Sequence, residues 1–139
     1  MSIAKFLNDI KNQLPSESVV SDPMRLFALG TDASFYRLVP KVVVYAQTDA
    51  DIQKILKLSH LHQVSVTFRA AGTSLSGQAV TDSVLVMLSD AWRSHRVEPL
   101  GDIIHLQPGV IGAQANRALK PYDRKIGPDP ASINACKIG

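Results

Sequence analysis

The sequence predicts an α+β domain that begins with a βαβ unit of parallel strands and continues as a mostly antiparallel sheet with short helices. Apolar residues recur at helical spacing in residues 3–14 and 49–62, which indicates amphipathic helices. Short β-branched runs at residues 42–45 and 64–68 flank the second of these helices. The strand patterns that follow have no helical pattern between them, which is typical of antiparallel neighbours.

The composition is that of one soluble globular domain, with 139 residues, 45% of them hydrophobic and 19% charged. The net charge of +3 comes without a basic run, so we expect no nucleic-acid partner. No apolar run approaches the roughly 20 residues of a transmembrane helix. The N-terminal segment has polar residues within its apolar pattern, whereas the central region of a signal peptide is continuously apolar. We therefore expect a cytoplasmic protein.

Cys136 is the only cysteine of the sequence. An internal disulfide is therefore excluded, and so is a cysteine-ligated iron–sulfur cluster or zinc site built from this chain alone. Any iron–sulfur cluster would have to lie in a C-terminal region beyond this sequence. The four histidines show no metal-ligand spacing, so we predict no metal site.

The first helix, over residues 3–14, is expected to end at Pro15. Asp22 followed by Pro23 resembles the start of a second, short helix, and Gly30 is its expected end. We expect these elements to form an N-terminal helical extension over residues 1–31, with the main domain in residues 32–139.

The main domain is expected to open with a strand at residues 42–45. Thr48 and Asp51 then form a predicted capping box for a helix that ends near His62, and residues 64–68 form a strand parallel to the first. Three further strands, which we expect to be antiparallel, follow at residues 84–88, 96–98 and 103–107. A short helix is expected at residues 113–119, and residues 126–139 are expected to be irregular because they are rich in Gly and Pro.

Residues 69–79, R-A-A-G-T-S-L-S-G-Q-A, follow the predicted strand at residues 64–68 with a turn of small residues. Gly72 and Gly77 can adopt backbone conformations closed to other residues, and successive amide N–H groups in such a turn form a concave anion site. Hydroxyl groups nearby add donors suited to a diphosphate. A small-residue surface loop without a ligand is the alternative interpretation.

Two common phosphate motifs are absent from this turn. Gln78 and Ala79 stand where a P-loop needs its lysine and its Ser or Thr, so nucleoside triphosphate hydrolysis is not expected. No glycine lies two residues from Gly72, as the dinucleotide fingerprint of Rossmann folds requires.

The turn resembles the pyrophosphate loop of the FAD-linked oxidases with the PCMH-type fold, named for vanillyl-alcohol oxidase and p-cresol methylhydroxylase. That family's loop has the pattern R-G-x-G-T-S-x-x-G, which is matched in order by Arg69, Gly72, Thr73, Ser74 and Gly77. The resemblance implies FAD as the cofactor and predicts cofactor-binding roles for Arg69, Ala71, Gly72, Thr73, Ser74, Leu75, Ser76, Gly77 and Gln78. Arg69 either pairs with phosphate or braces the loop through backbone carbonyls.

The resemblance extends over residues 32–139. The segments at residues 108–110, 127–132 and 136–139 resemble the family's P-G-V, P-P-D-P-S and C-T-I-G segments. We expect the domain to continue beyond the end of this sequence, since the family's last segment runs on past its first glycine. These matches add to the expected cofactor-binding residues Pro108, Gly109, Pro128, Asp129, Ser132 and Gly139.

Residues 31–40, T-D-A-S-F-Y-R-L-V-P, and the loop itself look most like the D-lactate dehydrogenase and glycolate oxidase flavoprotein branch. The resemblance implies oxidation of a D-2-hydroxy acid, such as D-lactate, glycolate or D-2-hydroxyglutarate, to the 2-oxo acid, with hydride passing to the flavin. It also implies that the catalytic residues lie outside this chain, so we expect these residues alone to be inactive. Thr73 stands where family members that bind FAD covalently through this loop have histidine, so we expect noncovalent FAD.

Two other functions stay open on the sequence alone. One is another FAD enzyme of the same fold, of the cell-wall precursor reductase or alkyl-ether lipid synthase type. The other is a noncatalytic diphosphate-binding module.

Overall fold

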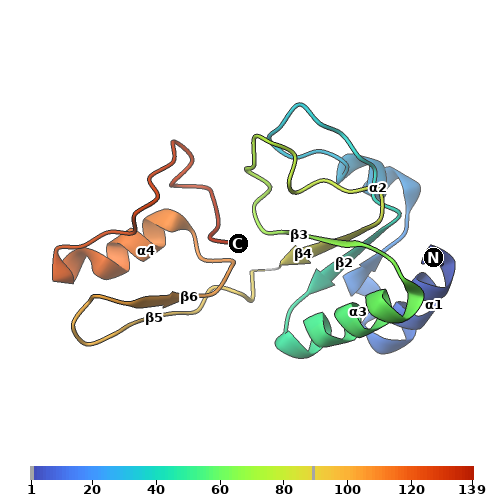
Figure 1. Cartoon of the computed structure of the whole chain (residues 1–139), viewed down its shortest axis with the longest axis horizontal. Helices are drawn as coiled ribbons and strands as arrows, with labels where there is room; N and C mark the ends of the chain where they lie inside the picture. Colours follow the sequence, from blue (N-terminus) through green and yellow to red (C-terminus); the bar gives the residue numbers. More distant parts are fainter. Residues whose placement is uncertain (1, 89) are drawn as a thin grey trace.

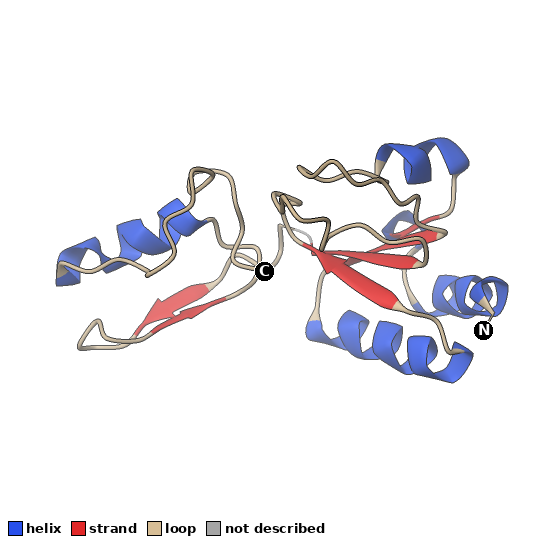
Figure 2. Cartoon of the chain, turned by 45° about the horizontal axis from the view of Figure 1, so that its top comes forward, coloured by secondary structure: helices blue, strands red, loops and turns tan. Residues whose placement is uncertain are grey.

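The computed structural model describes residues 2–88 and 90–139. Figures 1 and 2 show two parts: a sheet flanked by helices, and a smaller part that contains a two-stranded hairpin and one helix. The C-terminal end of the chain lies between these parts. Within the described residues, no helix combines the length and apolar character needed to cross a membrane.

The larger part is built on a four-stranded sheet with the strand order β1-β2-β4-β3. β4 (Val84–Leu88) lies between β2 (Val42–Ala46) and β3 (Val66–Arg69) and is parallel to both. The short strand β1 (Val19–Val20), which follows the 3-10 turn η1 (Ser16–Ser18), pairs with β2 in the antiparallel direction. The three parallel strands therefore end at the same edge of the sheet.

Helices cover both faces of this sheet (Figure 2). α1 (Ile3–Gln13) and α3 (Asp49–His62) pack on one face, and α2 (Pro23–Ala28) lies on the other. Because side chains alternate along a strand, β2 and β4 supply both cores. The first core is centred on Phe6, Ile10, Val42, Val44, Ile55, Val84 and Val86, and the second on Val20, Leu26, Val43 and Leu85.

The smaller part consists of a hairpin, a helix and the C-terminal segment. β5 (His95–Val97) and β6 (Ile104–Leu106) are antiparallel. α4 (Gly112–Leu119) continues into the 3-10 turn η2 (Lys120–Tyr122). The residues after it form turns, and a β-bridge between Ile111 and Lys137 returns the end of the chain to the start of α4.

The local signals of the sequence are confirmed at the helix ends. The side chain of Asp22 accepts a hydrogen bond from the amide of Arg25 at 2.9 Å, and Pro23 is the first residue of α2. The capping box of Thr48 and Asp51 begins α3. The helix at residues 113–119 and the antiparallel pairing of the strands near residues 96–98 and 103–107 are also present.

The predicted antiparallel direction of the strand at residues 84–88 was wrong. This strand is the parallel β4, inserted between the two strands that we expected to pair with each other. Residues 70–83 cross from the end of β3 to the start of β4 without a helix, although a parallel connection of about a dozen residues is usually helical. β3 also begins two residues late, because Gln63 adopts the left-handed conformation at the end of α3 and the amide of Val64 bonds to Ser59.

Candidate functional site

The small-residue turn leaves the carboxyl end of β3 and forms a loop over residues 70–79. Gly72 and Gly77 have φ values of 71° and 74°, in the left-handed region. Other residues disfavour this conformation by roughly 1–2 kcal/mol. The two glycines are therefore required by the backbone path of the loop, as the sequence indicated.

Three successive backbone donors of the loop bond to no acceptor among the described residues. Among the described residues, the amides of Gly72, Thr73 and Ser74 donate no hydrogen bond to the chain, and all three residues are half-buried. The Ser74 hydroxyl instead folds the loop, since it donates to the Gln78 side chain and accepts from the Ser76 amide at 3.2 Å. Successive amide donors of this kind suit phosphate oxygens.

A pocket of about 360 Å³ opens beside the loop. Its wall includes Gly139, whose amide donates to the Pro108 carbonyl at 2.9 Å. The amide of Gly109 donates to the Trp92 carbonyl at 2.8 Å, so the P-G-V segment is held in the same region. The pocket is lined by Phe68, Arg69, Ala70, Gly72, Thr73, Ser74, Gln78, Ala79 and Gly139.

The expected flavin-proximal segment at residues 127–132 lies apart from this pocket. Pro128, Asp129 and Ser132 do not line it. Asp129 forms an ion pair with Lys125 at 2.9 Å on the exposed surface. The Ser132 carbonyl accepts hydrogen bonds from the amides of Ala135 and Cys136. The structure thus places Gly139 at the pocket and Pro108 in contact with Gly139, and the cofactor-binding roles of all these residues stay predictions.

Arg69 turns its guanidinium toward the backbone of the protein. Nε donates to the Ala79 carbonyl at 2.8 Å, Nη2 donates to the same oxygen, and Nη1 donates to the Leu29 carbonyl at 2.9 Å. Only 6% of the residue is exposed. Burial lowers the pKa of Arg69 below its ordinary value, and the charge of Asp32 partly counters this. Of the two roles expected for Arg69, pairing with phosphate or bracing the loop through backbone carbonyls, these contacts match the second.

The loop also contacts a segment that the sequence analysis left without a role. The amide of Ala33 donates to the Gly72 carbonyl at 3.0 Å. The ring of Tyr36 lies so close to Gly77 that a Cβ there would be 2.7 Å from the ring. Asp32 holds this segment in a turn by accepting hydrogen bonds from the amide and hydroxyl of Ser34. The spacing Asp-x-Ser, typical of such turns, is the signal that could have marked it.

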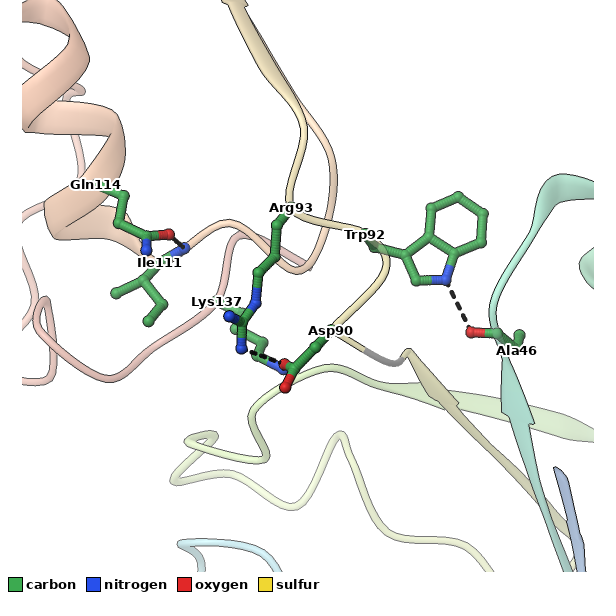
Figure 3. Close-up of polar contacts among 7 residues, drawn as sticks. All are labelled: Ala46, Asp90, Trp92, Arg93, Ile111, Gln114 and Lys137. Carbon is green, nitrogen blue, oxygen red and sulfur yellow. Dashed lines mark hydrogen bonds and ion pairs between the residues drawn. The ribbon is translucent and has the colours of Figure 1, made fainter. Parts of the chain in front are cut away.

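The junction between the two parts is drawn in Figure 3. Asp90 contacts Arg93 at 2.5 Å and Lys137 at 3.3 Å, which ties the C-terminal segment to the connection after β4. The Arg93 and Lys137 hydrogen bonds lower the pKa of the Asp90 carboxyl. The Gln114 side chain accepts from the amide of Ile111 at 3.1 Å and caps α4. These contacts hold the end of the chain beside the loop.

The donor set fits a diphosphate group. The pocket is lined by Arg69, by hydroxyl side chains and by residues whose amides bond to no acceptor among the described residues, and no Asp or Glu side chain lines it. Glycines allow close packing at this site, because a Cβ at Gly139 would lie 2.4 Å from Pro108 and one at Gly72 would lie 3.3 Å from Arg69. Among the described residues there is no group of three or more His, Cys, Asp or Glu side chains that could hold a metal ion.

A family model described as an FAD binding domain matches residues 40–139. Curated relatives include the D-2-hydroxyglutarate dehydrogenase of Escherichia coli (strain K12), which is 29% identical over 142 residues covering 99% of this chain. Glycolate oxidase subunit GlcD of the same organism is 34% identical over 108 residues, or 76% of this chain. The chain spans 14% and 22% of the lengths of these two relatives.

Solved structures share the fold. An alkyldihydroxyacetonephosphate synthase matches with a TM-score of 0.78 and 14% identity, covering 100% of this chain and 28% of that chain. A p-cresol methylhydroxylase with substrate bound matches with a TM-score of 0.69 and 16% identity, covering 86% of this chain and 24% of that chain. At these identities the likeness concerns the fold alone.

Proposed function

The chain belongs to the FAD binding domain family, and from this premise we propose that it forms the pyrophosphate-binding part of the flavin site in a D-2-hydroxy-acid dehydrogenase. The reaction proposed is oxidation of the hydroxy acid to its 2-oxo acid. The observation that supports the cofactor role is the loop of residues 70–79: the amides of Gly72, Thr73 and Ser74 bond to no acceptor among the described residues, and these residues line a pocket without a carboxylate side chain.

In this proposal the chain binds and orients the cofactor. The amides of Gly72, Thr73 and Ser74, together with the Thr73 hydroxyl, bind the diphosphate oxygens. Gly139, whose amide is held by the Pro108 carbonyl, contributes to the wall of the pocket. Acceptance of hydride from the C2 carbinol is the chemistry that bound FAD supplies. No residue of this chain is assigned a catalytic role.

The substrate class is supported by the curated relatives. D-2-hydroxyglutarate dehydrogenases align with 99% of this chain in Haemophilus influenzae and Escherichia coli, whereas the alkyldihydroxyacetonephosphate synthase is 14% identical and shares only the fold. We therefore favour a D-2-hydroxy acid over a lipid precursor or a cell-wall precursor.

The test uses the whole protein as its gene encodes it. The purified protein is expected to show flavin absorption, which should bleach without oxygen on addition of D-2-hydroxyglutarate, D-lactate or glycolate. Bleaching by one acid, but not by its L-enantiomer where one exists, would support the reaction. Flavin bands that none of the acids bleaches would exclude this substrate class and leave the other FAD enzymes of the fold. A protein that binds no FAD even when FAD is supplied would contradict the proposal and favour a noncatalytic diphosphate-binding module.

A further inference from the structure

Arg69 closes the loop at its base. Arg69 directly precedes the loop and Ala79 is its last residue, and the guanidinium of Arg69 donates to the carbonyl oxygen of Ala79 with both Nε and Nη2. Fixing the two ends of a flexible segment removes conformational freedom that ligand binding would otherwise have to remove. The contact is thus suited to holding the loop in its binding conformation before a ligand binds.

The same guanidinium joins the loop to residues 29–36, here called the bracing segment. Nη1 of Arg69 donates to the carbonyl of Leu29, at the end of α2. Farther along the loop, Ala33 bonds to Gly72 and the Tyr36 ring covers Gly77. The bracing segment precedes the residues 40–139 that match the family model, so the match gives it no role.

The charge of Arg69 is balanced within the protein. Its three hydrogen bonds to described residues all go to neutral backbone carbonyls, those of Ala79 and Leu29. Asp32 of the bracing segment supplies the nearby negative charge, and its Oδ2 is buried without a hydrogen-bond partner among the described residues. Three of the five N–H donors of this guanidinium are therefore committed to backbone carbonyls of the chain.

We propose that Arg69 is a positioning residue, which ties both ends of the loop to the bracing segment and so holds the loop amides in place for the FAD diphosphate. This role rests on the proposed function. The diphosphate itself is held by the loop amides, and Arg69 acts through them.

The substitution Arg69→Lys separates bracing from direct pairing with phosphate. Lysine is a good phosphate partner but lacks the planar fork that holds two carbonyls at once. If Arg69 braces the loop, we expect the FAD Kd to rise roughly ten- to a hundredfold, as for the loss of one or two charge-assisted hydrogen bonds. If it paired with phosphate directly, lysine would keep most of the affinity.

Binding of FAD, ADP-ribose and riboflavin to the flavin-free whole protein shows which part of the cofactor loses affinity in Arg69→Lys. ADP-ribose carries the diphosphate without the flavin ring, and riboflavin carries the ring without the diphosphate. Arg69→Lys should weaken FAD and ADP-ribose by the same factor and leave riboflavin unchanged, as measured by calorimetry or fluorescence titration. Hydrogen exchange should accelerate in residues 70–79 without a general increase.

The matched control is Arg37→Lys. Arg37 lies close to the bracing segment, is exposed, and donates to the Phe27 carbonyl at 3.2 Å while stacking on the Phe27 ring at 3.8 Å. Its replacement should change the FAD Kd by less than about twofold. Should Arg69→Lys fail to fold, Tyr36→Ala tests the brace from the other side: it should weaken FAD and ADP-ribose about threefold or more, whereas Tyr36→Phe should not.

Arg69→Lys with FAD affinity within about twofold of the original, or Tyr36→Ala with unchanged affinity, would overturn the positioning role. Equal losses for riboflavin and FAD would also overturn it, because they indicate general destabilisation. Failure of the proposed function is distinct, since then the unsubstituted protein would bind neither FAD nor ADP-ribose.

Discussion

The indole Nε1 of Trp92 donates a hydrogen bond of 2.8 Å to the carbonyl oxygen of Ala46, the last residue of β2 (Figure 3). Trp92 is buried, and its own carbonyl accepts the amide of Gly109. One residue therefore connects the carboxyl edge of the parallel sheet to the P-G-V segment. Because Pro108 in turn holds Gly139, this connection places the C-terminal segment against the loop.

Trp92→Phe should weaken this junction. Phenylalanine keeps most of the buried apolar surface but leaves the Ala46 carbonyl without its donor, which destabilises a protein by about 1–3 kcal/mol. We expect the free energy of unfolding in urea to fall by that amount. Phe35→Leu, at a fully exposed aromatic residue, is the control and should change it by less than about 0.5 kcal/mol. Equal effects of the two substitutions would contradict a specific role for the indole donor.

Gly77→Ala should distort the loop. The new Cβ would meet the Tyr36 ring at 2.7 Å, and the φ of 74° would add about 1–2 kcal/mol of backbone strain. We expect both a lower thermal midpoint and a higher FAD Kd, measured by calorimetry. Gly127→Ala is the matched control, because a Cβ at Gly127 has nothing within 4 Å and its φ is not positive. A Gly77→Ala protein that binds FAD normally would show that the loop can relax without harm.

FAD should be bound without a covalent bond to this chain. Thr73 occupies the position of the attachment histidine, and the pocket wall contains neither histidine nor cysteine. Heat or acid should release the flavin of the whole protein into the supernatant, where its fluorescence can be measured. Flavin that stays with the precipitated protein would disprove the prediction for any attachment within residues 1–139.

Asp32 should make stability depend on pH in the acid range. Burial raises the pKa of its carboxyl, but the Ser34 hydrogen bonds and the charge of Arg69 lower it more, so the net pKa is below the ordinary 3.8. A lowered folded-state pKa contributes stability above the ordinary value, and this stability is lost as the pH falls through the folded-state pKa.

The measurement is urea unfolding of the original protein and of Asp32→Asn between pH 6 and the acid limit of folding. The difference in unfolding free energy between them should be constant above about pH 5 and should change as the pH falls below 3.8. Parallel pH profiles over the whole range would show that the Asp32 carboxylate contributes nothing specific. Asp129→Asn, at an exposed carboxylate paired with Lys125, serves as the comparison.

Features that depend on neighbours along the chain were predictable from the sequence. Asp22 and the Thr48–Asp51 pair bond to amides three residues away, so their roles follow from spacing alone. Gly72 and Gly77 likewise adopt the conformation that their residue type permits. The same reasoning placed α1, β2 and α3 close to their observed bounds.

The direction of β4 was not predicted, although a signal was present. The run V-L-V-M-L is apolar on both faces, which is typical of a buried parallel strand, whereas an antiparallel strand with one face in water alternates. The absence of a helical pattern between residues 84–88 and the strands that follow outweighed that signal. Here the connection is the irregular segment of residues 70–83, which contains the loop and leads from the end of β3 to the start of the adjacent β4.

The sequence by itself determined which residues carry the loop chemistry: the glycines, hydroxyls and Arg69 lie within eleven consecutive positions, and local backbone rules suffice for them. Only the tertiary structure decided what surrounds that loop. The partners Leu29, Asp32 and Tyr36 on one side and Gly139 on the other are distant in sequence, so no periodicity or spacing relates them to the loop. They meet it because burial of the parallel sheet orders the chain around its carboxyl edge.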